Sequence, residues 1–289
     1  MSFFVIPAEA GIQEIQIPLD SCLRRSDKFS GLFPRASFIV IFDQSRNECY
    51  PFPMGEPELF DEWPKRYDAW FTTPIGQLVK KYESELLLRF LRPRSDEFIL
   101  DAGCGTGVFT LDILSFGAHV VGVDLSLPML SRAAQKAEAY CFDAVMANIS
   151  LLPFPENVFD KVVSVTALEF IEDAKRAIEE LFRVTKRGSH IVVATLNSLS
   201  PWAERRKAEA KKGHPLFQKT IFRSPDELLS LAPVEGVIGT AIHFQKDDDP
   251  DRAQEVERQG REKGLMTGAF VAACWKKPVK IDKDVKNPL

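Results

Sequence analysis

Ile99-Leu-Asp-Ala-Gly-Cys-Gly-Thr-Gly107, followed by Val120-Val-Gly-Val-Asp124, is the stretch of this sequence that decides the fold. An apolar strand leads into an acid and three glycines at alternate positions, and a second apolar strand ends on another acid. Glycine lets a backbone turn tightly and approach a ligand with no Cβ in the way. A helix after such a loop presents free N–H groups to a ligand, and the second acid can accept hydrogen bonds from ribose hydroxyls. The stretch therefore predicts a nucleotide-shaped cleft in an α/β sheet.

The spacing of the glycines separates two classes of ligand. Enzymes that bind dinucleotides space their glycines G-x-G-x-x-G, whereas here the third glycine falls one residue early and Val108 holds the expected position. Asp101 opens the loop, and a carboxylate there would oppose a pyrophosphate but suits a ligand with a cationic amino group. The spacing disfavours a nucleotide-dependent oxidoreductase, which stays an alternative.

An acid followed by G-x-G-x-G, with a second acid ending the next strand, resembles the class I S-adenosylmethionine-dependent methyltransferases. The resemblance covers roughly Phe60 to Trp275; it is to the type 11 methyltransferases and, more distantly, to the ubiquinone and menaquinone biosynthesis methyltransferases. It implies a Rossmann-like, doubly wound α/β fold whose seven-stranded sheet is mostly parallel, with an antiparallel last strand at or near the edge. It also implies a helical lid inserted after the fifth strand, and S-adenosylmethionine as cofactor.

The same resemblance assigns a role to each candidate cofactor contact. Asp101 would balance the cofactor's amino group, N–H groups near the first two glycines would face its carboxylate, and Asp124 would accept from the ribose. Asn148 stands where family members carry an acid that binds adenine, and its carbonyl can still accept a weaker, neutral hydrogen bond. The predicted cofactor-binding residues are Tyr67, Asp101, Gly103, Gly105, Gly107, Asp124, Leu125, Asn148, Ile149 and Thr166.

Six of these predictions have a purely structural alternative. Asp101 could be a cap at the end of its strand, and Asp124 a charge at the start of a helix. Leu125 and Ile149 would enclose the adenine ring, or could be ordinary core residues. Thr166 would border the sulfonium, or could simply favour a strand as a β-branched residue. Tyr67 lies in a segment that covers the cofactor in similar small-molecule methyltransferases, but that segment could also dock only through hydrophobic contacts.

No catalytic residue is predicted. Methyl transfer is mainly a matter of alignment, and a general base is needed only when the acceptor carries a proton. Glu169, His214 and Tyr67 are the candidates that could reach the mouth of the cleft. Neither an N-P-P-Y sequence nor a proline–cysteine nucleophile follows the fourth strand, which argues against methylation of nucleic-acid bases. We expect a small-molecule acceptor, with a hydrophobic or aromatic one favoured; a non-catalytic cofactor-binding protein is the alternative.

Composition argues against several other classes of protein, namely nucleic-acid-binding, metal-binding, membrane-spanning and secreted proteins. The 289 residues carry a formal net charge of −4, which argues against a broad nucleic-acid-binding surface. Five scattered cysteines and four histidines show no metal-ligand spacing. No apolar run is long enough to span a bilayer, and the first residues lack the pattern of a secretory signal. These features predict a reduced, cytoplasmic protein of unknown oligomeric state.

Composition also divides the chain into segments. Residues 1–53 contain phrases that resemble translated copies of a repeat scattered between bacterial genes, which predicts a true start at Met54; a disordered N-terminal arm is the alternative. We expect an N-terminal helical cover over 54–96, the methyltransferase domain over 97–278 with its lid at 199–232, and a frayed tail over 279–289. The charged stretch Lys246 to Lys263 is predicted to be a mobile loop.

The periodicity of hydrophobic residues predicts the strands and helices. Strands are expected near 97–102, 119–124, 141–147, 159–166, 189–196, 234–244 and 268–275, and helices near 77–91, 107–116, 127–138 and 172–185.

Overall fold

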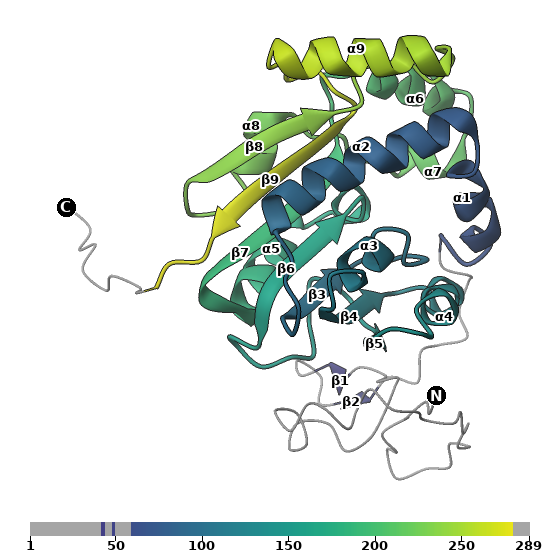
Figure 1. Ribbon diagram of the computed structural model, residues 1–289. Helices are drawn as coiled ribbons and strands as arrows, with labels where there is room; N and C mark the ends of the chain where they lie inside the picture. The colour runs from purple at the N-terminus through teal and green to yellow at the C-terminus, as the bar shows by residue number, and fades with distance from the viewer. Residues whose placement is uncertain (1–41, 44–47, 50–58, 280–289) are drawn as a thin grey trace.

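The computed structural model describes residues 42–43, 48–49 and 59–279, and its centre is a seven-stranded sheet (Figure 1). The strand order is β5-β4-β3-β6-β7-β9-β8, and every pairing is parallel except those of β9, which runs antiparallel to both neighbours. The strands are β3 (Phe98–Ala102), β4 (His119–Asp124), β5 (Phe142–Met146), β6 (Phe159–Val165), β7 (Thr185–Leu196), β8 (Gly236–Ala241) and β9 (Phe270–Lys276). The predicted fold class is confirmed, with β9 one strand in from the edge.

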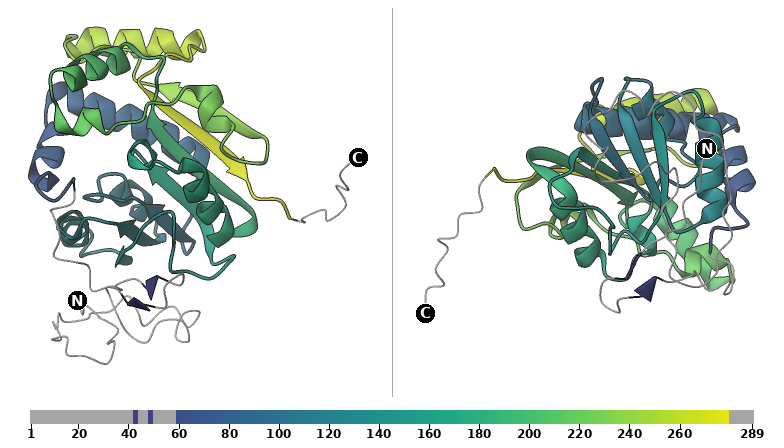
Figure 2. Two further views of the ribbon diagram at one scale, coloured as in Figure 1. Left: turned by 180° about the vertical axis from the view of Figure 1, so that it is seen from behind. Right: turned by 90° about the horizontal axis from the view of Figure 1, so that it is seen from below.

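Helices cover both faces of the sheet, because alternate side chains of the central strands feed two separate cores (Figure 2). In β3, Ile99 belongs to one core and Leu100 to the other, and both are fully buried. The first face carries α2 (Pro74–Leu91), α3 (Thr110–Leu114) and α4 (Leu127–Lys136); the second carries α5 (Ala174–Val184) and α8 (Pro225–Leu229).

The N-terminal part of the described chain forms two helices, α1 (Pro64–Trp70) and α2. Helix α2 starts three residues before the predicted boundary because the Thr73 side chain caps it, accepting from Gly76 N at 3.0 Å, and Pro74 occupies the first turn. It ends at Arg92, which has a φ of 48°, one residue before a proline. The buried face of α2 joins the first core, so this helix is part of the domain's interior as well as a cover.

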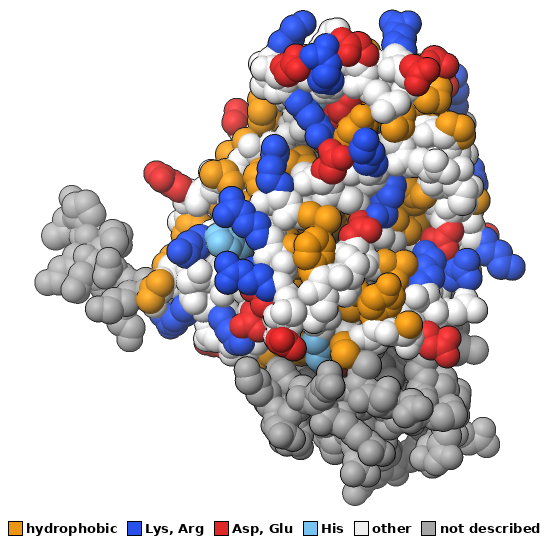
Figure 3. Space-filling view, viewed as in Figure 1, with side chains coloured by type: hydrophobic (Ala, Val, Ile, Leu, Met, Phe, Trp, Pro, Cys, Tyr) orange, Lys and Arg blue, Asp and Glu red, His pale blue; other side chains and the backbone are white. Residues whose placement is uncertain are grey.

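The prediction of a mobile loop over Lys246 to Lys263 is wrong, because the chain there forms α9 (Pro250–Glu262). Asp249 caps the helix, and Ala253 and Glu257, four residues apart, are buried on one face. The exposed faces carry ion pairs such as Arg258 with Glu262, and both signs of charge are interspersed over α9 in Figure 3. Low apolar content misled the prediction: a helix that buries small side chains and pairs its charges needs little hydrophobicity.

The segment between β7 and β8 contains α6 (Pro201–Lys211), α7 (Pro215–Gln218) and α8. The residues between α7 and α8 are hydrogen-bonded to the chain that follows β6. Ile221 N donates to Glu169 O at 2.8 Å, and Arg223 Nη1 donates to Leu168 O at 2.9 Å. Helix α8 instead buries Leu228 in the second core. Of the predicted lid, Lys219 lines the cleft described below, whereas α8 packs on the second face of the sheet.

The predictions for residues 1–53 and for the tail fall largely outside the described residues. Inside the first segment the structure describes the paired strands β1 (Phe42–Asp43) and β2 (Glu48–Cys49), and inside the second it describes Val279. Within the described ranges, no helix combines the length and the apolar character needed to cross a membrane.

Candidate functional site

A cleft of about 310 Å³ opens at the carboxyl ends of β3, β4 and β6. Strand β3 pairs with β4 on one side and β6 on the other, so the chain reverses its winding direction at this point, which is where open α/β sheets bind ligands. All the predicted cofactor-binding residues except Gly107 line the cleft. Gly107 instead has a φ of +76°, and a Cβ there would meet Ala133 of α4 at 3.1 Å.

The glycines of the loop leave space in the cleft, and their own N–H groups are used in hydrogen bonds within the protein. Gly103 has a φ of +80°, and a Cβ at this position would lie 2.3 Å from the Ala167 Cβ, whereas a Cβ on Gly105 would meet nothing within 4 Å. The N–H groups of the two glycines themselves are bonded within the protein: Gly103 N donates to Val123 O at 2.6 Å and Gly105 N donates to Asp124 Oδ2 at 2.9 Å. These bonds tie the loop to β4 and leave open space above Gly105.

Asp101 has one satisfied and one unsatisfied oxygen. Its Oδ2 accepts from Thr110 Oγ1 at 2.6 Å, while Oδ1 is enclosed and has no hydrogen-bond partner. Burial is the main reason that the pKa of Asp101 is raised to about 7; the hydrogen bond from Thr110 opposes the shift, and the negative charge of Asp124 adds to it. An enclosed acceptor without a donor is costly unless a ligand supplies one. This oxygen fits the amino group of the implied cofactor.

Asp124 is oriented from both sides. Its Oδ1 accepts from Ser126 N and its Oδ2 from Gly105 N, each at 2.9 Å. Burial raises the pKa of this carboxyl, and backbone hydrogen bonds from Ser126, Gly105 and Leu125 oppose that shift. A carboxylate can accept about four hydrogen bonds, so Asp124 keeps capacity to accept from a ligand. The arrangement fits a ribose diol.

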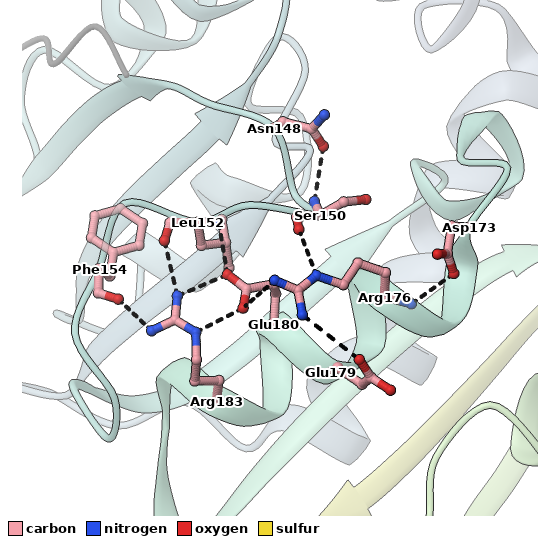
Figure 4. Close-up of polar contacts among 9 residues, drawn as sticks. All are labelled: Asn148, Ser150, Leu152, Phe154, Asp173, Arg176, Glu179, Glu180 and Arg183. Atoms are coloured by element: carbon pink, nitrogen blue, oxygen red, sulfur yellow. Dashed lines mark hydrogen bonds and ion pairs between the residues drawn. The ribbon is translucent and has the colours of Figure 1, made fainter. Parts of the chain in front are cut away.

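The loop after β5 forms the third wall, and helix α5 holds it in place (Figure 4). Asn148 Oδ1 accepts from Ser150 N at 2.8 Å, so one of its two acceptor positions serves the loop itself. Further along, Leu152 N donates to Glu180 Oε2 at 2.8 Å, and Arg183 donates to Leu152 O at 2.9 Å. Ile149, buried, and Leu125, 37% exposed, also line the cleft.

Thr166 and Tyr67 enclose the end of the cleft near β6. Thr166 has a φ of 48°, unusual for a β-branched residue, and its N–H donates to Ala194 O at 2.9 Å. Burial raises the pKa of Tyr67, the charges of Glu83 and Glu169 raise it further, and a hydrogen bond with Thr166 acts in the opposite direction. The structure thus places Tyr67 on α1 directly over the strand end.

Polar contacts of Asp68 fasten α1 to the glycine loop and to α4. The carboxylate accepts from Thr106 Oγ1 at 2.7 Å, from Lys136 Nζ at 2.6 Å and from Arg132 Nε at 2.9 Å. Three bonds from two elements fix this short helix even though none of its residues is fully buried. Tyr67, next to Asp68, is positioned through this anchor.

Sequence reasoning missed several residues of the cleft. Phe60 and Phe170 form an edge-to-face pair with centroids 4.8 Å apart, and Lys219 lies at the wall. Other lining residues that were not predicted are Leu59, Cys104, Val108, Phe109, Ser126, Met129, Ala147, Val165, Ala167 and Ile171. The rich aromatic content after Leu59 was the available signal for Phe60; Lys219 comes from a distant segment and had none.

Of the three candidate bases, only Tyr67 lines the cleft. Glu169 is 1% exposed and accepts from Thr195 Oγ1 at 3.0 Å. His214 stacks on Phe217 with centroids 4.1 Å apart, and its Nδ1 is enclosed without a partner. The described residues contain no group of histidine, cysteine and acidic side chains able to hold a metal ion.

Comparison with known proteins agrees with this geometry. The methyltransferase domain family matches residues 100–193. The chain is 33% identical over 195 residues to the malonyl-[acyl-carrier protein] O-methyltransferase of Salmonella typhimurium, which covers 59% of this chain and 76% of that protein. It is 30% identical over 217 residues to an uncharacterized protein of Methanocaldococcus jannaschii, covering 74% and 96%.

Solved structures show the same fold. A S-adenosylmethionine-dependent methyltransferase of Thermotoga maritima, described as a possible histamine N-methyltransferase, superposes with a TM-score of 0.55 at 21% identity. The match covers 75% of this chain and 97% of that one.

Proposed function

The chain belongs to the S-adenosylmethionine-dependent methyltransferases, and we propose that it methylates a small-molecule acceptor. One observation carries the proposal: the enclosed, unpartnered Asp101 Oδ1 and the doubly tethered Asp124 carboxylate line one cleft at the switch point of the sheet. Those two groups suit the two polar ends of a nucleoside linked to an amino acid.

We assign each wall of the cleft a part of the cofactor. Asp101 would bind the amino group, Asp124 the ribose hydroxyls, and Asn148 the exocyclic amine of adenine through the free acceptor position of Oδ1. Leu125 and Ile149 would enclose the ring. The open space above Gly105 supports this assignment, because a side chain there would fill part of the same cleft.

The bound cofactor supplies an activated methyl group, so the protein's own task is orientation and exclusion of water. Tyr67 and Thr166 would define where the sulfonium end lies, since both line the cleft at the end of β6. Aromatic rings stabilise a nearby cation and exclude water; α1 brings Tyr67 to the cleft, and the turn before that helix brings Phe60.

The lining also supports a small acceptor with an apolar or aromatic part. Leu59, Phe60, Phe170 and Ile171 form a largely apolar wall, and Lys219 adds one cation. The net charge of −4 gives no general attraction for nucleic acid.

The test is a single-turnover reaction. Purified protein is mixed with S-adenosylmethionine labelled in its methyl group and a deproteinised cell extract, and small molecules are separated from protein. Label in a metabolite supports the proposal. Tight binding of S-adenosylhomocysteine without any transfer would contradict it and favour a non-catalytic binding protein. Asp124→Ala serves as the control that should abolish transfer.

A further inference from the structure

A single lysine interrupts the apolar wall of the cleft. Lys219 follows α7, and Phe170 ends the short 3₁₀ helix η2 (Leu168–Phe170). Among the described residues that line the cleft, Lys219 is the one that carries a positive charge. The apolar side chains of the wall are those of Leu59, Phe60, Phe170 and Ile171. This part of the cleft is therefore apolar with one cation on it.

The chain after Lys219 holds this lysine next to the apolar wall. Ile221 N donates to Glu169 O at 2.8 Å, and Arg223 Nη2 donates to Ile171 O at 3.3 Å. These bonds attach the segment after α7 to η2 and to the residue that follows it. The position of Lys219 beside the wall is thus fixed by hydrogen bonds of its own segment.

Helix α7 also lies against α1, the helix that carries Tyr67. The rings of Trp63, at the start of α1, and His214, at the start of α7, have centroids 6.2 Å apart. Phe60, in the turn before α1, packs edge-to-face on Phe170 with centroids 4.8 Å apart. The wall and its lysine are therefore assembled where the start of α1, η2 and α7 meet.

The charge of Lys219 is not used within the described part of the protein. Its side chain is exposed and makes no hydrogen bond or ion pair with any residue that the structure describes. Basic residues of neighbouring α6 are paired, as Arg205 is with Glu209 at 3.1 Å and Lys207 with Glu204 at 3.0 Å. A cation without a protein partner is available to an anion, and apolar neighbours that exclude water strengthen such a pair.

The loop after β6 contributes to two different parts of the cleft. Thr166, at the near end of the loop, lines the cleft together with Tyr67, where the sulfonium of the cofactor is assigned. Phe170 and Ile171, at the far end, lie with Lys219. An acceptor whose reacting atom reaches Thr166 and Tyr67 would therefore extend along the apolar wall towards the lysine.

We propose that Lys219 binds an anionic group of the acceptor, a carboxylate or a phosphate that an apolar or aromatic body separates from the methylated atom. The carboxylate of the cofactor is the competing anion, and the variants described below separate the two. This inference rests on the proposed function, since it names the class of acceptor for the same cleft.

The first measurement uses the wild-type protein. Labelled small molecules from the single-turnover reaction are passed over an anion exchanger at pH 7, which does not retain unreacted S-adenosylmethionine because its net charge is positive. The inference expects the labelled product to bind and to elute with salt. Loss of retention after phosphatase treatment would identify a phosphate, and unchanged retention a carboxylate. A labelled product that passes through the exchanger would overturn the inference and leave the proposed function intact.

The second measurement uses variants of Lys219 and a matched control. Lys219→Gln should slow single turnover about tenfold in dilute extract and less in concentrated extract, because the variant binds the acceptor more weakly. Lys219→Arg, which keeps the charge, should retain most of the wild-type rate. Lys212→Gln, which removes an exposed lysine at the end of α6 outside the cleft, should leave the rate unchanged.

Affinity for S-adenosylhomocysteine separates the two possible anions and also reports folding. It should match that of the wild-type protein in all three variants. A loss of affinity in Lys219→Gln would show that Lys219 binds the carboxylate of the cofactor, and would overturn the inference. An unchanged rate for Lys219→Gln at every dilution of the extract would overturn it as well. Absence of any transfer by the wild-type protein would defeat the proposed function, and the inference with it.

Discussion

Two parts of the molecule are built in opposite ways. In the cofactor half, formed by β3, β4 and the loops after them, Asp124 and the glycine loop are tied by backbone hydrogen bonds within one continuous stretch of chain. In the part behind Tyr67, three charged residues that we call the charge cluster, Glu83, Glu169 and Arg206, come from three distant segments, and no ion pair joins them in the part of the chain that the structure describes.

The two parts also differ in which of their buried polar groups lack a hydrogen-bond partner. The cofactor half leaves one enclosed oxygen, Asp101 Oδ1, in an otherwise satisfied network. The charge cluster instead holds two carboxyl groups whose pKa values are raised by burial, Glu83 and Glu169, and one enclosed nitrogen without a partner, Nη1 of Arg206. Local backbone bonds thus satisfy most of the cofactor half, whereas burial disfavours the charged forms of the cluster.

Removing the tethered carboxylate should produce the largest effect. Asp124→Ala should weaken S-adenosylhomocysteine binding by about 3 kcal/mol, because two ribose hydroxyls lose their acceptor in an enclosed cleft. Isothermal titration calorimetry measures this loss. Asp112→Ala, which removes the ion-pair partner of Lys80 outside the cleft, is the control and should bind normally. Unchanged affinity for Asp124→Ala would mean that the cofactor half has been misplaced.

A pair of glycine variants should separate folding from binding. Gly103→Ala should cost about 2–3 kcal/mol in the free energy of unfolding, since its Cβ would lie 2.3 Å from the Ala167 Cβ and its φ is +80°. Gly105→Ala should cost only about 1 kcal/mol, from its positive φ alone, but should weaken cofactor binding. Urea unfolding and calorimetry distinguish the two. If the two variants were destabilised equally, the expected difference in packing between Gly103 and Gly105 would be wrong.

In the charge cluster, removing the Glu83 carboxyl should stabilise the protein at high pH. The pKa of Glu83 is about 8 when folded against an ordinary 4.5, so folding favours its protonated form and stability falls as pH rises through this range. Glu83→Gln should therefore be more stable than wild type at pH 8.5 by about 2 kcal/mol, and about equal to it at pH 5. Thermal unfolding at both pH values tests this. A variant that is less stable at pH 8.5 would show that Glu83 is already paired.

Cofactor binding should itself depend on pH through Asp101. The pKa of this carboxyl is about 7 without ligand, and a bound ammonium group favours the ionised form. Affinity for S-adenosylhomocysteine should rise about tenfold between pH 5.5 and 7.5, and Asp101→Asn should bind more weakly with little pH dependence. Calorimetric titrations in that range provide the measurement; a flat wild-type profile would count against the assigned ammonium contact.

The smallest effect should come from restoring the acid at Asn148. Asn148→Asp should tighten S-adenosylhomocysteine binding by about 1 kcal/mol, because a charged acceptor binds an amine more strongly than an amide carbonyl does. S-Inosylhomocysteine, which carries a carbonyl oxygen in place of the adenine amine, should show no gain. The same gain for both ligands would remove Asn148 from adenine recognition.

Prediction from sequence worked where chain order and spatial proximity coincide. The glycine loop and Asp124 are joined through neighbouring strands, and nine of the ten predicted cofactor residues line the cleft. It failed for α9, where small residues and paired charges stand in for the usual apolar stripe. Glu83 had a visible signal that was missed: an acid between Val79 and Leu86, on the buried face of α2.

By itself, the sequence determined the sheet, the cofactor cleft and the family, because alternating apolar residues, alternate glycines and strand-ending acids act within a few residues of one another. Only the tertiary structure decided which N–H groups remain free, which Asp101 oxygen is unsatisfied and which charges surround Tyr67. Those properties depend on burial and on contacts between α1, α2, α6 and η2. Segments so far apart in the chain meet only after the sheet and its two cores have formed.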